Sequence, residues 1–147
     1  MKHMTRVMMT TGDIGLLLAI GLALAAPGLA GAANFDGSNN LVCVPTDAIQ
    51  CEGAGECART EVEALNMPKF LLVDFKKKQL RGTAEGATEE TTSKIQNVEK
   101  FGDRTLLQGS QNGRGWSLNI DAMTGDMTAA IAADDLAFVL FGVCQPR

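Results

Sequence analysis

Histidine and tyrosine are both scarce in this sequence. The chain of 147 residues has a single histidine, His3, and no tyrosine. His3 lies in an N-terminal segment that we expect to be removed, which would leave the rest of the protein without an imidazole. This excludes Ser-His-Asp catalysis, Cys-His catalysis and histidine metal sites. We therefore expect a protein that is not an enzyme and that needs no cofactor and no metal.

Positive charge is also scarce. The chain has 13 basic and 17 acidic residues; residues 1–32 hold two of the basic and one of the acidic, so residues 33–147 keep 11 and 16, a formal charge of −5. Phosphate binding depends on Lys and Arg, so nucleic acid and anionic lipid are not expected partners. The one basic cluster, Lys76-Lys77-Lys78, lies between two apolar runs. It indicates a solvated hairpin turn, with a phosphate contact as the alternative.

The N-terminus has the pattern of a secretory signal peptide. Lys2 and Arg6 precede an uncharged apolar run over residues 14–26, and Ala30-Gly31-Ala32 supplies the small residues that a signal peptidase reads. We predict cleavage after Ala32 and a periplasmic or secreted protein without stable membrane insertion. The run is short of the about 20 residues that a membrane span needs. A retained N-terminal anchor is the alternative.

Four cysteines follow the predicted cleavage site, and an even number in a small exported domain favours disulfide bonds. Three pairings are possible. We favour Cys51 with Cys57, because the Gly-rich stretch between them can close a small loop. Cys43 would then pair with Cys144 and tie the first strand to the last. A zinc site is the alternative, although the spacing lacks paired C-x2-C knuckles and the destination is oxidising.

The distribution of turn signals predicts a single all-β domain over residues 41–147, after a flexible leader over 33–40. Gly102-Asp103, Asn112-Gly113, Thr124-Gly125 and Asp134-Asp135 recur at the spacing of an antiparallel meander in a small barrel or sandwich. We expect about eight strands, and the polar stretch 84–93 as an exposed loop or an acidic docking segment. The strands are expected at 41–44, 69–75, 79–83, 95–100, 105–110, 115–121, 126–132 and 136–144. One helical turn is expected at 60–65, with a strand that ends at Val62 as the alternative.

The best-defined hairpin joins two strands at Asn112-Gly113, a dipeptide that tolerates the positive φ of a tight turn. After it, Trp116, Leu118 and Ile120 alternate with polar residues, as in a half-buried strand. Arg114 next to the only tryptophan would suit a recognition patch for a carboxylate, a sugar or a protein. The alternative is that Trp116 fills the core while Arg114 solvates the turn.

Carboxylates are the remaining candidates for acid and base chemistry. Asp74 lies inside an apolar run, where burial would raise its pKa and suit it to act as a general acid. The alternative is an Asp at a strand end, bonded to the backbone or to a lysine. The segment Asp121–Asp126 resembles a calcium loop only loosely, since it lacks the alternating oxygen ligands and the terminal bidentate glutamate. A hairpin turn explains it better.

These residues also carry a resemblance. Leu107-Gln108-Gly109, Gly113-Arg114-Gly115-Trp116, Thr124-Gly125-Asp126-Met127 and Phe141-Gly142-Val143-Cys144, behind an exported N-terminus, resemble a family of small exported bacterial proteins rich in β-structure, for which no activity is known. The architecture is also similar to that of periplasmic inhibitors of C-type lysozyme. Their inhibitory loop has a Ser-Gly-x-x-x-Tyr type of signature, which this chain, without tyrosine, does not have.

The functional expectation is an exported, noncatalytic binding or inhibitory module of the cell envelope, with an unknown protein or small molecule as its partner. Arg114 and Trp116 are the candidate binding residues. The first alternative is a calycin-like carrier that holds a small apolar ligand in the mouth of a barrel. The others are a protein similar to the lysozyme inhibitors and a hydrolase that depends on a carboxylate such as Asp74.

Overall fold

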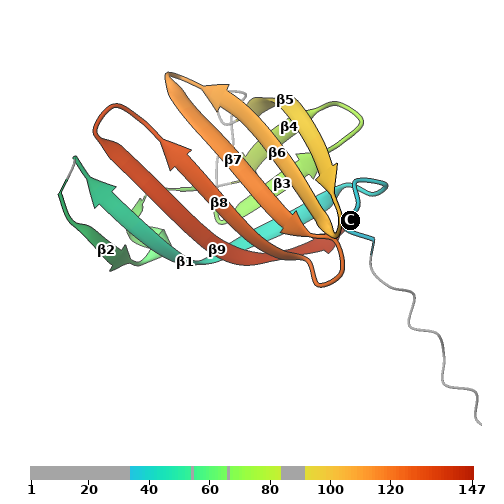
Figure 1. Cartoon of the computed structure of the whole chain (residues 1–147), viewed down its shortest axis with the longest axis horizontal. Helices are drawn as coiled ribbons and strands as arrows, with labels where there is room; N and C mark the ends of the chain where they lie inside the picture. The colour runs from blue at the N-terminus through green and yellow to red at the C-terminus, as the bar shows by residue number, and fades with distance from the viewer. Residues whose placement is uncertain (1–33, 54, 66, 84–91) are drawn as a thin grey trace, which may run out of the picture. The chain divides into compact units, whose positions relative to one another are not determined.

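The computed structural model describes residues 34–53, 55–65, 67–83 and 92–147. The predicted signal peptide and most of the predicted acidic loop, residues 84–91, lie outside these ranges. No helix in the described ranges has the length and apolar character to cross a membrane. The described elements are nine antiparallel strands and one 3-10 turn (Figure 1): β1 (Leu41–Glu52), β2 (Cys57–Thr60), η1 (Val62–Leu65), β3 (Phe70–Asp74), β4 (Gln79–Thr83), β5 (Thr92–Phe101), β6 (Arg104–Gln111), β7 (Arg114–Asp121), β8 (Asp126–Ala132) and β9 (Leu136–Pro146).

The sheet closes into a barrel, which decides between the two predicted architectures. Neighbouring strands pair in the order β2-β1-β3-β4-β5-β6-β7-β8-β9, and β1 also pairs with β9 along its whole length, from Leu41 with Pro146 to Glu52 with Leu136. The first three residues of β1 pair with β3, and its second half pairs with β2. Eight strands thus form the closed wall, and β2 extends it on one side. The predicted all-β meander is confirmed.

Strand β1 runs further than the sequence indicated. We expected it to stop near Pro45 because proline cannot donate a ladder hydrogen bond. The strand instead continues through Pro45, where its register with β9 shifts before Asp47. A bulge is one of the positions at which a sheet tolerates proline. The continuation carries β1 to the hairpin with β2, in place of the Gly-rich loop that was predicted.

Both predicted disulfide bonds are present. Cys43 in β1 and Cys144 in β9 are directly opposite each other in the ladder and are joined by a disulfide bond. Cys51 and Cys57 are likewise opposite each other in β1 and β2 and are joined by the second bond. The first bond fixes the seam at which the barrel closes, and the second fixes the β1–β2 hairpin.

Side chains in register across adjacent strands fill the middle of the barrel. Leu107, Leu118, Ala129 and Leu140 occupy matching positions on β6, β7, β8 and β9. All four are buried, and the three leucines are almost completely inaccessible to solvent. Each buried leucine contributes roughly 1.5–3 kcal/mol of transfer free energy. This layer separates the two ends of the barrel.

Phe35 seals one end. Its exposed fraction is 4%, and its backbone carbonyl accepts a hydrogen bond from the buried Thr105 hydroxyl at 3.3 Å. Its ring also packs against Gly125 in the β7–β8 turn, where an added Cβ would come within 2.6 Å of the ring. The core therefore begins before Leu41, the position at which we expected order to start. Residues 33–40 were predicted to be a flexible leader because most of them are small or polar, and a single phenylalanine among them does not change the average composition of the segment.

Candidate ligand-binding site

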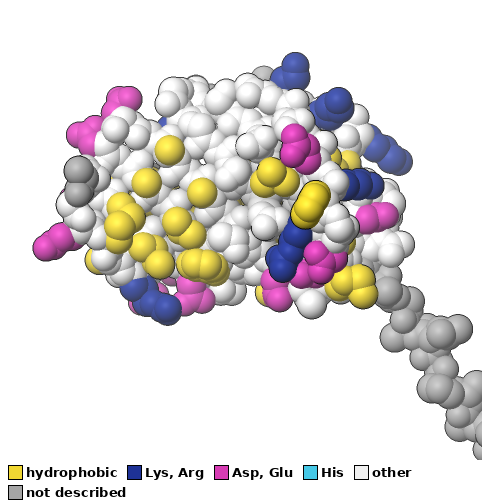
Figure 2. All heavy atoms as spheres, in the orientation of Figure 1, with side chains coloured by type: hydrophobic (Ala, Val, Ile, Leu, Met, Phe, Trp, Pro, Cys, Tyr) yellow, Lys and Arg dark blue, Asp and Glu magenta, His cyan; other side chains and the backbone are white. Residues whose placement is uncertain are grey.

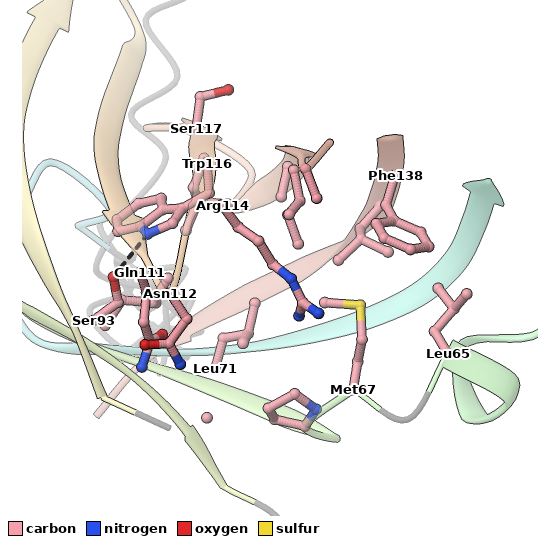
Figure 3. Close-up of a pocket in the computed structure, with 18 of the residues that line it drawn as sticks. Leu65, Met67, Leu71, Ser93, Gln111, Asn112, Arg114, Trp116, Ser117 and Phe138 are labelled. Atoms are coloured by element: carbon pink, nitrogen blue, oxygen red, sulfur yellow. Dashed lines mark hydrogen bonds between the residues drawn. The ribbon is translucent and has the colours of Figure 1, made fainter. Parts of the chain in front are cut away.

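The other end of the barrel is open and holds a cavity of about 460 Å³. Its lining is mostly apolar, with a few polar groups near the rim, as the close-up shows (Figure 3). The residues that line it are Leu65, Met67, Pro68, Leu71, Leu80, Gly82, Ser93, Gln111, Asn112, Arg114, Trp116, Ser117, Leu118, Ala129, Ile131, Ala133, Leu136, Phe138 and Leu140.

Strands β7, β8 and β9 build one wall. The middle layer forms the floor, and the next inward layer toward the mouth consists of Trp116, Ile131 and Phe138, which are cross-strand partners. This wall follows from the alternation of each strand, because inward residues recur at every second position. Ala129 lies between Leu118 and Leu140 in the floor and is the small residue that leaves the space open.

A second wall comes from a segment whose contribution the sequence pattern did not indicate. Leu65 at the end of η1 and Met67 beyond it pack against the core, and Pro68 lines the cavity beside them. Leu71 of β3 and Leu80 of β4 continue this wall. Figure 3 shows the Met67 side chain directed into the cavity toward Arg114.

Trp116 is held in a fixed orientation. Its indole Nε1–H donates a hydrogen bond to the Ser93 hydroxyl oxygen at 2.8 Å (Figure 3). Its ring lies over Gly109, the cross-strand partner on β6, where an added Cβ would come within 2.7 Å of Trp116 Cε2. One edge of the ring is therefore bonded to Ser93 and part of it covers Gly109, while other parts of the ring line the cavity.

Arg114 lies at the rim. It follows the Asn112-Gly113 turn, in which both residues have positive φ, and it shares the inward parity of Trp116 and Leu118. Figure 3 shows its guanidinium reaching across the mouth toward Met67. No hydrogen bond or ion pair joins this side chain to any described residue. It is also the one charged side chain among the described residues that line the cavity.

A polar groove of about 700 Å³ adjoins the mouth on the outer side of Arg114. Three carboxylates line it: Glu52 at the end of β1, and Asp134 and Asp135 in the β8–β9 turn. None of them lies within 4.0 Å of the guanidinium, although they are its acidic neighbours in this groove. Arg114 lines this groove as well as the cavity, so its side chain lies between an acidic outer side and an apolar inner side.

No family model matches the chain, and no curated protein or solved structure matches it either. Within the ranges that the structure describes, no three His, Cys, Asp or Glu side chains gather in a group that would hold a metal ion. The function must therefore be inferred from the cavity and the groups at its rim.

The two predicted binding residues lie together in this cavity. Trp116 packs against the core and also forms part of the cavity wall. It is therefore both a core residue and a candidate binding residue, the two interpretations that the sequence left open. Asp74 lies elsewhere, at the β3–β4 turn, where its carboxylate accepts a hydrogen bond from the Lys77 backbone N–H at 2.9 Å. This is the strand-end contact that the alternative interpretation predicted.

The Asp121–Asp126 segment is a hairpin turn. One carboxylate oxygen of Asp121 accepts hydrogen bonds from the backbone N–H groups of Met123 and Thr124, each at 2.9 Å. Both bonds stabilise the ionised carboxylate, and the bond from Thr124 has the larger effect. They hold the pKa of Asp121 below its ordinary value of 3.8. The other carboxylate oxygen lies 3.4 Å from Arg104 Nη2, so both oxygens of Asp121 have partners within the protein.

Proposed function

We propose that this protein is an exported, noncatalytic binding protein that takes a small, largely apolar molecule into the open mouth of its barrel. The volume of about 460 Å³ falls within the about 300–1,000 Å³ that small-molecule sites usually have. Two walls of apolar side chains with a few polar groups at the rim match the usual composition of such sites.

The contrast between the two ends of the barrel is the observation that carries this proposal. Phe35 fills the closed end, whereas the described residues of the other end surround a cavity with the small side chain of Ala129 in its floor. Apolar surface that faces water at the open mouth forgoes about 25 cal/mol for each Å² that burial would contribute. A ligand that occupies the cavity would recover part of that contribution.

Binding without turnover is the simpler reading of the chemistry at this site. Among the described residues, the lining carries no carboxylate and no histidine that would act as a general base. Ser93 accepts a hydrogen bond from Trp116 and donates one to the Ser110 carbonyl at 3.3 Å, so its hydroxyl orients the indole. The secretory N-terminus and the two disulfide bonds support a site of action in the periplasm or outside the cell.

Two adjacent alanines on β8 allow a matched test. Ala129 points into the cavity, and Ala130 lies on the exposed outer face. N-phenyl-1-naphthylamine, a neutral apolar fluorophore, would be titrated while the emission of Trp116 is recorded. We expect saturable quenching, with an affinity about tenfold or more weaker in Ala129→Leu and unchanged in Ala130→Leu. Equal affinity in both variants, or no saturable binding by the parent protein, would refute the proposal.

A second candidate, protein binding, rests on a different surface. Hydrophobic side chains gather over β8 and β9 (Figure 2), and Phe141 and Val143 on β9 are 40% and 44% exposed. A partner that docked on this face would be lost in a Phe141→Asp variant and kept in Ala129→Leu. Affinity capture from an envelope extract with these two variants separates the two functions.

A further inference from the structure

We propose that the molecule bound in the barrel mouth is an amphiphile with a carboxylate head group, held by Arg114, and an apolar tail that runs toward the floor of the cavity. This inference rests on the proposed function and adds the chemical class of the ligand. It comes from the juxtaposition of one unpaired guanidinium with an apolar cavity.

Arg114 carries the one charge among the described residues that line the cavity. The residue is exposed at the rim, so its guanidinium stays in contact with water and needs no partner in the protein, which leaves its N–H donors available to a ligand. Arg114 has no partner among the described residues, yet its side chain extends over the cavity (Figure 3). Its planar fork of N–H donors matches the two oxygens of a carboxylate, so an anion at this point would complete the site.

The neighbouring carboxylates decide where such an anion can bind. Glu52, Asp134 and Asp135 line the outer groove and would repel a negative head group placed there. The inner side of Arg114 faces Trp116 and Met67 and carries no acidic side chain among the described residues of the lining. The head group therefore binds on the inner side, which directs the tail down between the walls.

The side chains of the cavity walls determine the chemical character of the ligand's tail. Below Arg114 the lining passes through Trp116, Ile131 and Phe138 to Leu118 and Leu140, without a charged group in the described part. Each buried methylene contributes about 0.8 kcal/mol, which corresponds to about a fourfold gain in affinity. Affinity in a series of fatty acids should therefore rise by about fourfold for each CH₂ until the cavity is full, and then level off.

The test compares three ligands of equal chain length: decanoate, 1-decanol and decylammonium, each used below its micelle concentration. Quenching of Trp116 emission would report binding to the parent protein and to Arg114→Gln and Arg114→Lys. The control is Arg81→Gln, which removes the same charge from an exposed residue of β4 that does not line the cavity. Circular dichroism would confirm that each variant is folded.

We expect decanoate to bind the parent at least about tenfold more tightly than 1-decanol. The ratio of the decanoate affinity to the 1-decanol affinity should fall to near one in Arg114→Gln and be intermediate in Arg114→Lys. It should be unchanged in Arg81→Gln. Equal binding of decanoate and 1-decanol to the parent, or tightest binding of decylammonium, would overturn the carboxylate assignment and leave the apolar site in place. Failure of all three ligands to bind would overturn the proposed function as well.

Discussion

The two disulfide bonds should differ in their contributions to stability, because they close loops of very different length. Cys43 and Cys144 are 101 residues apart in the sequence, whereas Cys51 and Cys57 are 6 apart. In the chain-entropy model, a crosslink stabilises a protein by restricting its unfolded state. The two loops correspond to about 4.7 kcal/mol and about 2.2 kcal/mol at 25 °C.

The environment of the cysteines widens this difference. Cys43 and Cys144 have exposed fractions of 0% and 2%, whereas Cys57 is exposed. Replacing the buried pair by alanine also removes packed sulfur atoms from the seam between β1 and β9. The Cys43→Ala, Cys144→Ala variant should therefore lose at least about 2.5 kcal/mol more than the Cys51→Ala, Cys57→Ala variant.

Urea denaturation, followed by Trp116 emission and circular dichroism, measures this difference. With an m-value of about 1.5 kcal/mol/M, the midpoints of the two variants should lie about 1.7 M apart, with the long-loop variant lower. A long-loop variant that is already unfolded without urea would agree with the expectation. Equal midpoints, or a lower midpoint for the short-loop variant, would refute the reasoning that the seam bond dominates.

Three further changes test individual contacts. Gly109→Ala places a methyl group against the Trp116 ring and the Lys94 backbone carbonyl and should cost about 1–3 kcal/mol in urea unfolding. Gly115→Ala, which meets nothing within 4 Å, should cost less than about 0.5 kcal/mol, and equal costs would show that these neighbours do not enclose Gly109. Phe35→Ala opens the sealed end and should cost about 3–5 kcal/mol, so a loss under about 1 kcal/mol would mean that the residue is not packed in the core. Because the pKa of Asp121 is lowered on folding, its stabilising contribution is present above pH 3.8 and is lost as the pH falls through the lower value of the folded state. In Asp121→Asn the melting temperature should consequently fall less than that of the parent between pH 5 and pH 2, and an identical fall in both proteins would contradict this.

Local patterns were sufficient to predict most of the strands. The hairpin at Asn112-Gly113 has the positive φ values that this dipeptide favours, of 50° and 76°. The alternation after it placed Trp116, Leu118 and Ile120 on the inner face correctly. Turns and alternation are set by neighbouring residues, so they can be read from a short stretch of sequence.

Closure of the barrel is a property of residues far apart in the chain. Nothing near Pro45 indicates that β1 will continue along β9 after a bulge, because the strand is stabilised by pairing with residues about 95 positions away. Leu65 at the end of η1 and Met67 just beyond it line the cavity from a segment that is too short to show a periodicity. Arg114 did carry a usable signal, since it lies two positions before Trp116 and so shares its inward parity.

The most direct test of the ligand site uses the indole N–H resonance of Trp116, the only tryptophan in the chain. In a ¹H–¹⁵N correlation spectrum this single cross-peak reports the hydrogen bond to Ser93 at the wall of the cavity. On titration with decanoate, the peak should shift progressively and saturably, together with the amide peaks of Ile131 and Phe138. An indole peak that stays fixed while amide peaks of Ala130 and Phe141 on the outer face move would contradict the proposal that the mouth of the barrel is the binding site.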